Sequence, residues 1–163
     1  TASELDFQDR SALKAMGALP ERIDALLANV NVIRSVRHRA VGALSELKGA
    51  GRLEVIDQIA QCDTVWRAYF LSDALQLLRW RNRTMGYEGL GVHGRLAVGV
   101  TPDGTVEVPA PIDFVIWTPE VAEFATREDI AQYKRRLILQ GNLSAETSTQ
   151  LTASGWDVIK VPR

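Results

Sequence analysis

One stretch of the sequence matches a glycine pattern that is used to hold phosphates. Residues 89–94, Gly-Leu-Gly-Val-His-Gly, fit the form G-x-G-x-x-G. In a dinucleotide site this pattern follows a strand and opens a helix, so that the helix N-terminus faces the pyrophosphate. Here a helical pattern precedes the glycines, a strand pattern follows them, and the partner motifs of protein kinases are missing. We therefore interpret the stretch as a flexible connection between two lobes.

Two groups of basic side chains have the chemistry to contact phosphates. One lies within a single helical stretch and the other surrounds Trp80 at the end of a longer helix; the candidates are Arg34, Arg37, His38, Arg79, Arg81 and Arg83. Arginine pairs with phosphate oxygens, and a neighbouring aromatic ring can stack on a base. Arginines near a helix C-terminus also interact favourably with the helix dipole. Since the formal net charge is -1, nucleic-acid binding stays an alternative and is not the favoured function.

A third group of polar residues lies where parallel strands are predicted to end. In an α/β sheet the ligand crevice lies beyond the carboxyl ends of the strands, which here means the loops 117–118 and 140–144. The candidate ligand-binding residues in these loops are Thr118, Gly141, Asn142 and Ser144. Glycine permits close approach and the other three offer polar groups, although any strand-to-helix turn favours the same residue types. A small-ligand-binding or transferase-like enzyme is therefore the second alternative.

Residues for acid–base or metal chemistry are few. His38 and His93 are the two histidines, and neither is expected near the strand ends. Asp113 is expected at the opposite end of the sheet from the crevice. Cys62 is the single cysteine, which excludes an internal disulfide, and no spacing of ligand residues predicts a metal. We expect no catalytic residue, metal site or cofactor, and we favour a non-enzymatic interaction or accessory module whose partner is another protein.

The first half of the chain has the apolar spacing of helices. Between 32 and 48 the apolar residues recur at intervals of three and four, which is typical of an amphipathic helix. Glycine, proline and asparagine residues interrupt the pattern near 17–20, 29–31 and 49–51. We predict a helical lobe of four to five helices over residues 1–84. Its longest helix carries a broad aromatic and aliphatic stripe that must pack against something large.

The second half switches to the period of strands. Residues 85–94 are predicted to form a Gly-rich connection and residues 95–163 an α/β lobe. A β-hairpin is expected around Thr101-Pro102-Asp103-Gly104, because proline and glycine favour the turn angles. Thr118 followed by Pro119 is a strong helix start, Ser144 is expected to cap another helix, and Gly155 to end it.

The run Ile112–Trp117 is predicted to organise this lobe as a central strand. It is almost entirely apolar, which is typical of a strand covered on both faces, so Phe114 and Ile116 should be nearly inaccessible. Further strands are expected near 136–140 and 156–161. The predicted fold is α+β, with the helical lobe packed on a small mixed sheet made of a hairpin plus βαβαβ. The two lobes are expected to share one core.

The composition is that of a globular protein, with 46% hydrophobic and 24% charged residues. No apolar run approaches the roughly 20 residues that a membrane-spanning helix needs. We therefore expect a soluble protein without a membrane span. The sequence does not determine the compartment: the protein is expected to be either cytoplasmic or, because the chain opens on Thr1, exported after removal of an N-terminal signal.

Overall fold

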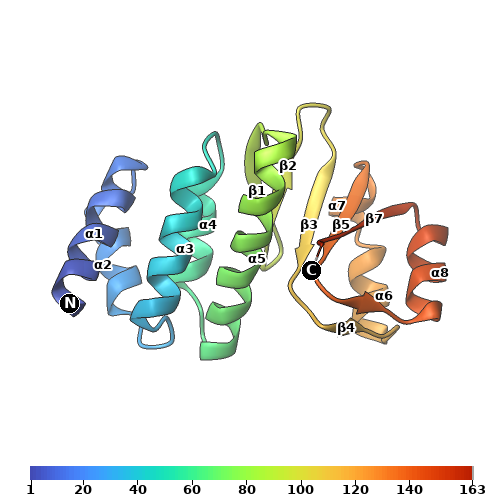
Figure 1. Cartoon of the computed structure of the whole chain (residues 1–163), viewed down its shortest axis with the longest axis horizontal. Helices are drawn as coiled ribbons and strands as arrows, with labels where there is room; N and C mark the ends of the chain where they lie inside the picture. The colour runs from blue at the N-terminus through green and yellow to red at the C-terminus, as the bar shows by residue number, and fades with distance from the viewer. Residues whose placement is uncertain (163) are drawn as a thin grey trace.

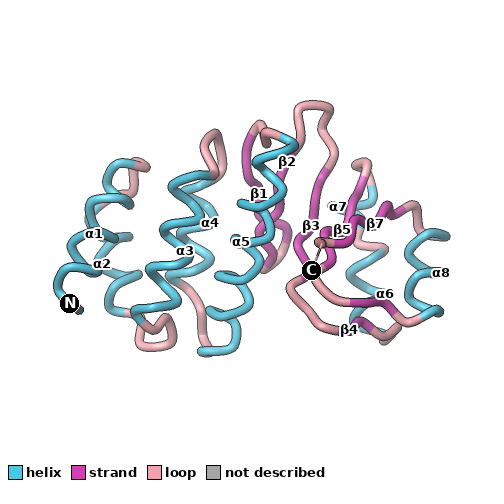
Figure 2. The backbone as a smooth tube through the Cα atoms, in the orientation of Figure 1, coloured by secondary structure: helices cyan, strands magenta, loops and turns pink. Residues whose placement is uncertain are grey.

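The N-terminal helices form two layers (Figures 1 and 2). The computed structural model describes residues 1–162. One layer holds α1 (Ala2–Ala15), α3 (Arg34–Glu46) and α5 (Val65–Met85), and the other holds α2 (Pro20–Ala28) and α4 (Arg52–Ala60). Each helix buries one apolar face between the layers, where Leu13, Leu44, Val55 and Leu75 have no exposed surface. Burial of this shared stripe holds the helical lobe together.

The C-terminal half forms a mixed sheet with the strand order β1-β2-β3-β5-β7. These strands are β1 (Gly89–His93), β2 (Leu96–Val100), β3 (Val106–Ala110), β5 (Arg135–Leu139) and β7 (Trp156–Lys160). Strand β2 is antiparallel to both of its neighbours, β1 and β3, and β3, β5 and β7 are parallel. Helix α5 packs on β2 and β3. The predicted α+β fold, a helical lobe packed on a mixed sheet, is confirmed.

Three further helices connect the parallel strands: α6 (Pro119–Ala125), α7 (Glu128–Ala131) and α8 (Ala145–Ala153). The predicted signals set their ends. The Thr118 side chain caps α6, Pro119 is its first residue, and the Ser144 side chain caps α8. Gly155, just after α8, has a φ of 86°, which disfavours residues with a β-carbon. The sequence therefore determines these boundaries locally.

Residues 85–94, predicted as a Gly-rich connection, contain strand β1. The strand pairs along its whole length with β2, and Leu90 donates a 2.8 Å hydrogen bond to the carbonyl of Ala50 in the α3–α4 turn. Tyr87 lies over Gly99, where an added β-carbon would be 2.4 Å from its ring. These contacts hold the segment between the two lobes. Because β1 turns back into another strand, no helix N-terminus follows the glycines to face a phosphate.

The prediction that residues 112–117 form the central strand is wrong. Only Phe114–Val115 (β4) is a strand, and it pairs with Asn142–Leu143 (β6) in a separate two-stranded sheet. Phe114 and Ile116 are each 55% exposed, whereas the neighbouring Val115 and Trp117 pack against the sheet core. The place of the organising strand is taken by β3, which pairs with β2 on one side and β5 on the other.

Pro109 is the reason why the sequence does not indicate that β3 is a central strand. Proline lacks the N–H that a central strand needs, so it favours the end of a strand. The pairing with β2, however, reaches only Glu107, while the pairing with β5 continues to Ala110. The N–H of Val106 points toward β5, so by alternation the nitrogen of Pro109 faces the side where pairing has ended. The strand therefore tolerates proline without losing a ladder bond.

Alanine substitutions should distinguish the two strand assignments. We expect Phe114→Ala to lower the free energy of unfolding by less than about 1 kcal/mol, because half of its side chain already contacts water. Ile138→Ala on β5 should cost about 2–5 kcal/mol, because Ile138 is fully buried. Urea denaturation measures both values. A loss at Phe114 as large as that at Ile138 would contradict the exposed position of β4.

The buried apolar side chains form two clusters. The first fills the helical lobe and includes Tyr87, Leu90 and Ala97 from the hairpin. The second lies between the sheet and α6–α8, where Trp156 donates a 2.9 Å hydrogen bond to the carbonyl of Ala125. Over residues 1–162, no helix has both the length and the apolar character needed to cross a membrane.

Candidate functional site

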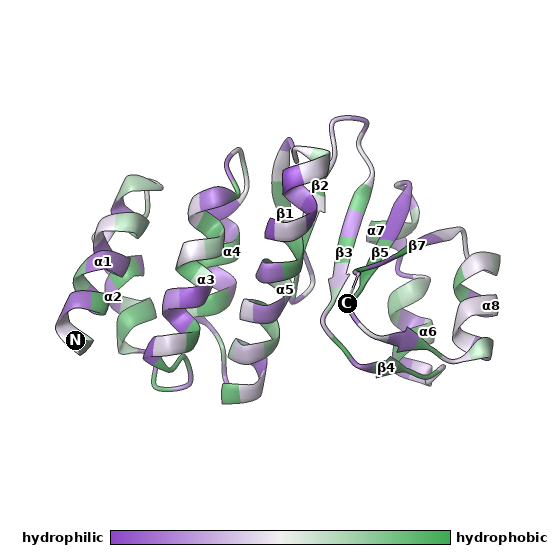
Figure 3. Cartoon of the chain, viewed as in Figure 1, coloured by the Kyte–Doolittle hydropathy of each residue, from purple (hydrophilic) through white to green (hydrophobic). Residues whose placement is uncertain are grey.

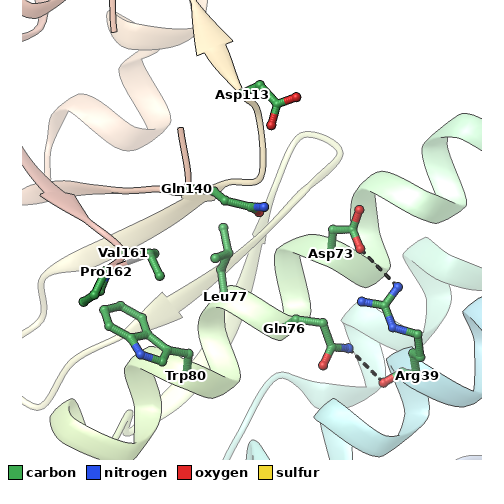
Figure 4. A pocket seen from close by; sticks show the side chains of 9 residues that line it. All are labelled: Arg39, Asp73, Gln76, Leu77, Trp80, Asp113, Gln140, Val161 and Pro162. Carbon is green, nitrogen blue, oxygen red and sulfur yellow. Dashed lines mark hydrogen bonds and ion pairs between the residues drawn. The ribbon is translucent and has the colours of Figure 1, made fainter. Parts of the chain in front are cut away.

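A cleft of about 810 Å³ lies between the helical lobe and the carboxyl ends of the three parallel strands (Figure 4). Its sheet side is formed by residues that follow β3, β5 and β7, and its helical side by α3 and α5; the lining residues are Arg39, Asp73, Gln76, Leu77, Trp80, Asp113, Gln140, Val161 and Pro162. The carboxyl ends of parallel strands are the usual ligand position in α/β sheets. The cleft is therefore the leading candidate site.

The two ends of the cleft differ in chemistry. Figure 4 shows the indole ring of Trp80 beside Val161 and Pro162, with the Asp113 side chain at the far end. Gln140 lies between them, and its amide points into the cleft. One end thus offers an aromatic and aliphatic surface, and the other offers a carboxylate.

On the helical side of the cleft, formed by α3 and α5, the charged side chains are paired with each other. Arg39 and Asp73 form an ion pair of 3.2 Å, and Gln76 donates a 3.0 Å hydrogen bond to the backbone carbonyl of Arg39. Among residues 1–162, by contrast, no side-chain hydrogen bond or ion pair engages the exposed carboxylate of Asp113. Asp113 is therefore the uncompensated charge among the described residues that line the cleft.

The sequence prediction placed Asp113 at the wrong end of the sheet. That prediction counted Asp113 as the beginning of the organising strand, whereas it follows the carboxyl end of β3. The backbone carbonyl of Asp113 accepts a 2.9 Å hydrogen bond from Asn142, which joins the segments after β3 and β5. Recognising Val106–Ala110 as the first parallel strand would have placed Asp113 in the crevice.

The predicted ligand residues Thr118 and Ser144 act as helix caps. The hydroxyl of Thr118 accepts from the N–H of Val121 at 3.2 Å, and that of Ser144 accepts from the N–H of Thr147 at 3.1 Å. Each hydroxyl satisfies a backbone donor that the helix start would otherwise leave free. Local structure thus accounts for both residues.

The other two predicted ligand residues, Gly141 and Asn142, hold the strand ends together. An added β-carbon at Gly141 would lie 2.0 Å from the carbonyl oxygen of Asp113, so glycine permits an approach of backbone to backbone. Asn142 belongs to β6, and its side chain accepts a hydrogen bond from Lys160. These residues lie next to the cleft and support its sheet side, while the lining residue of this loop is Gln140.

The first basic cluster forms an ion network between α1 and α3. Arg37 donates to the buried Asp9 over 2.7 Å and also pairs with Asp6, which Arg34 approaches to 2.9 Å. His38 Nδ1 lies 2.7 Å from the second carboxylate oxygen of Asp9. Hydrogen bonds from Arg34 and Arg37 lower the pKa of Asp6 to about 2. Both guanidinium groups are therefore already paired with carboxylates.

The second basic cluster is divided between two carboxylates. Arg79 and Arg83 approach Glu46 on α3 at 3.8 and 3.5 Å, whereas Arg81 turns toward the sheet and binds Glu107. The structure therefore does not gather the three arginines around Trp80 on one face.

Glu107 is a buried charge that the sequence analysis missed. It lies on β3 under α5 with no exposed surface, and it accepts hydrogen bonds from Arg81 at 2.9 Å, Tyr87 at 2.7 Å and Arg136 at 2.5 Å. Burial alone raises the pKa of this carboxyl, but the bonds from Arg81, Tyr87 and Arg136 outweigh it and hold the pKa below its ordinary value. Burial and the neighbouring carboxylate raise the pKa of Tyr87.

The Glu107 network joins the two lobes. Arg81 comes from α5, Tyr87 from the start of the hairpin and Arg136 from β5. The sequence contains no signal of this network, because the alternation Val106-Glu107-Val108 is typical of a strand whose charged face is in water. The packing of α5 on β3 buries the glutamate.

A second, apolar hollow of about 230 Å³ lies between α5, β3 and α6. Glu120 is the only charged residue among the described residues that line it, which also include Phe70, Ile112, Val115, Val121 and Phe124. We call this hollow the apolar groove. Next to it, Ile112, Phe114 and Ile116 are 41%, 55% and 55% exposed. We call these three residues the apolar stripe. Ile112 lies in the connection from β3 to β4, where Figure 3 shows hydrophobic residues, while Phe114 lies in β4 and Ile116 follows it.

Comparison of the chain with protein-family models, with curated proteins and with solved structures found no match.

Proposed function

We propose that this protein binds a small organic cation with an apolar body in the cleft between its lobes. The observation that carries this proposal is the position of the cleft at the carboxyl ends of all three parallel strands. Binding is proposed as the activity of this cleft, whose described lining residues offer a carboxylate, an amide and an indole ring.

The charges and the aromatic residue of the cleft define the ligand class. Asp73 is paired with Arg39, so Asp113 supplies the carboxylate that an ammonium or guanidinium group would meet. The ring of Trp80 at the other end suits an apolar or aromatic body. Gln140 lies between the two ends and offers both a donor and an acceptor.

Three probes that differ only in their polar head test the proposal: phenethylamine, 2-phenylethanol and phenylacetate. We expect the amine to bind about tenfold more tightly than the carboxylate, because a charge-assisted bond contributes about 1.5–3 kcal/mol. Asp113→Asn should remove this preference, and Trp80→Leu should weaken all three probes. Heteronuclear NMR titration measures the affinities and shows whether the indole resonance of Trp80 shifts.

The matched control is Glu21→Gln, which removes an exposed carboxylate on α2 and should change nothing. Preference for phenylacetate, or a preference for the amine that survives Asp113→Asn, would contradict the proposal.

A second function, docking of a partner protein, is favoured by a separate observation. Phe114 and Ile116 expose more than half of their surface beside the apolar groove. Contiguous exposed apolar surface is a feature of interaction sites. Nucleic-acid binding has weaker support, because Arg34, Arg37 and Arg81 are engaged by carboxylates of the same chain.

A further inference from the structure

The apolar stripe is one face of a segment whose other face is partly buried. Val115 and Trp117 pack against the sheet core, and the residues that alternate with them, Phe114 and Ile116, face outward. A strand that is apolar on both faces is typical of one covered on both sides. In this chain only the inner side is covered, so the outer side has the composition of a contact surface.

The apolar groove continues this surface toward α5. Ile112, the first residue of the stripe, also lines the groove opposite Phe70 of α5. One helical turn before Phe70, on the same face of α5, Trp66 is 82% exposed. A hollow flanked by exposed large side chains is the arrangement in which a partner inserts an apolar anchor.

The charged residues of the segment that carries the stripe have one sign. Residues 96–126 contain Asp103, Glu107, Asp113, Glu120 and Glu123 and no lysine, arginine or histidine. Glu107 is neutralised inside the protein, but Asp113, Glu120 and Glu123 are exposed, and Glu120 lines the groove itself. One base lies close by: Lys160 donates a hydrogen bond to Asn142, which pairs with Phe114 in the two-stranded sheet. The border of the stripe is therefore acidic on balance.

We propose that the apolar stripe and groove dock a basic amphipathic helix of a partner protein, whose apolar anchors enter the groove while its lysines or arginines face Glu120 and Glu123. This inference rests on the proposed docking function and adds the chemistry of the partner. Complementary charge speeds encounter and excludes partners of the wrong sign, whereas the apolar anchors provide most of the affinity. A helix presents anchors three and four residues apart, a spacing that suits a short stripe beside a single groove.

Three synthetic helical peptides test the charge. They share one leucine face and carry lysine, glutamine or glutamate at the remaining positions, and fluorescence anisotropy measures their affinity. We expect the lysine peptide to bind about tenfold more tightly than the glutamine peptide and the glutamate peptide to bind most weakly, with the differences shrinking as salt is added. The double variant Glu120→Lys, Glu123→Lys should reverse the order.

Variants of the stripe test the surface. Phe114→Ser combined with Ile116→Ser should abolish binding of all three peptides while leaving the thermal midpoint nearly unchanged, because both side chains are exposed. Phe7→Ser is the matched control: Phe7 is 72% exposed on α1, at the opposite end of the molecule (Figure 1), and its loss should leave peptide binding intact.

The possible failures are distinguishable. Equal binding of the three peptides that still requires Phe114 and Ile116 would overturn the basic partner and leave the docking function standing. If the stripe variant binds the peptides as the wild type does, or if no peptide binds, both the docking function and the basic partner are overturned. Sedimentation analysis provides the remaining test: a dimer abolished by the stripe variant would mean that a second copy of the chain is the occupant, which also overturns the basic partner.

Discussion

Glu107→Ala is expected to lower the free energy of unfolding by about 3–5 kcal/mol, the usual effect of removing one partner from a buried ion pair. Glu107 has no exposed surface and accepts bonds from Arg81, Arg136 and Tyr87. Without the carboxylate, two largely buried guanidinium groups would lose their counter-charge, and the hydroxyl of Tyr87 would lose its acceptor. Urea denaturation at neutral pH measures the loss.

The effect should depend on pH in a known direction. Because the folded-state pKa of Glu107 lies below its ordinary value, its ionised form contributes stability above the unfolded-state pKa of about 4.3. That contribution is lost as the pH falls through the lower, folded-state pKa. The difference in unfolding free energy between the wild type and Glu107→Ala should therefore be full at pH 7 and smaller in strong acid.

Glu123→Ala is the matched control, because Glu123 is an exposed glutamate on α6. Its substitution should change the unfolding free energy by no more than about 0.5 kcal/mol. If Glu107→Ala changes the free energy of unfolding as little as Glu123→Ala does, the contacts between α5 and the sheet do not depend on the Glu107 network.

A fragment that begins at Arg95 should fail to fold. It lacks α5, which covers β2 and β3, and strand β1, which pairs with β2. It would also leave Glu107 without Arg81 and Tyr87. We expect poor dispersion of its amide resonances, binding of a hydrophobic dye, and a single cooperative unfolding transition for the whole chain.

Limited proteolysis of the whole chain provides the opposing outcome. Residues 89–93 are held by full pairing with β2 and by the bond from Leu90 to Ala50, so cleavage there should be slow. Rapid cutting between Gly86 and Gly94 that releases two stable fragments would show that the lobes fold independently.

The sequence by itself determined the helical lobe, the α+β class and many element ends. Thr118, Pro119, Ser144 and Gly155 lie where they were predicted, because capping and positive φ depend on the residue and its immediate neighbours. The turn of residues 101–104 joins two strands for the same reason. The sequence also predicted a ligand crevice at the loops that follow the parallel strands, and one residue of these loops, Gln140, lines the cleft.

Only the tertiary structure decided which strand is central, what the arginines bind and where the cleft lies. An apolar run does not reveal whether its second face is covered, so Phe114 and Ile116 were predicted to be buried although they are exposed. The carboxylate partners of Arg37 and Arg81 lie 28 and 26 residues away along the chain, beyond any local pattern. The cleft unites side chains of α3 and α5 with three strand ends, and only the packing of the two lobes brings them together.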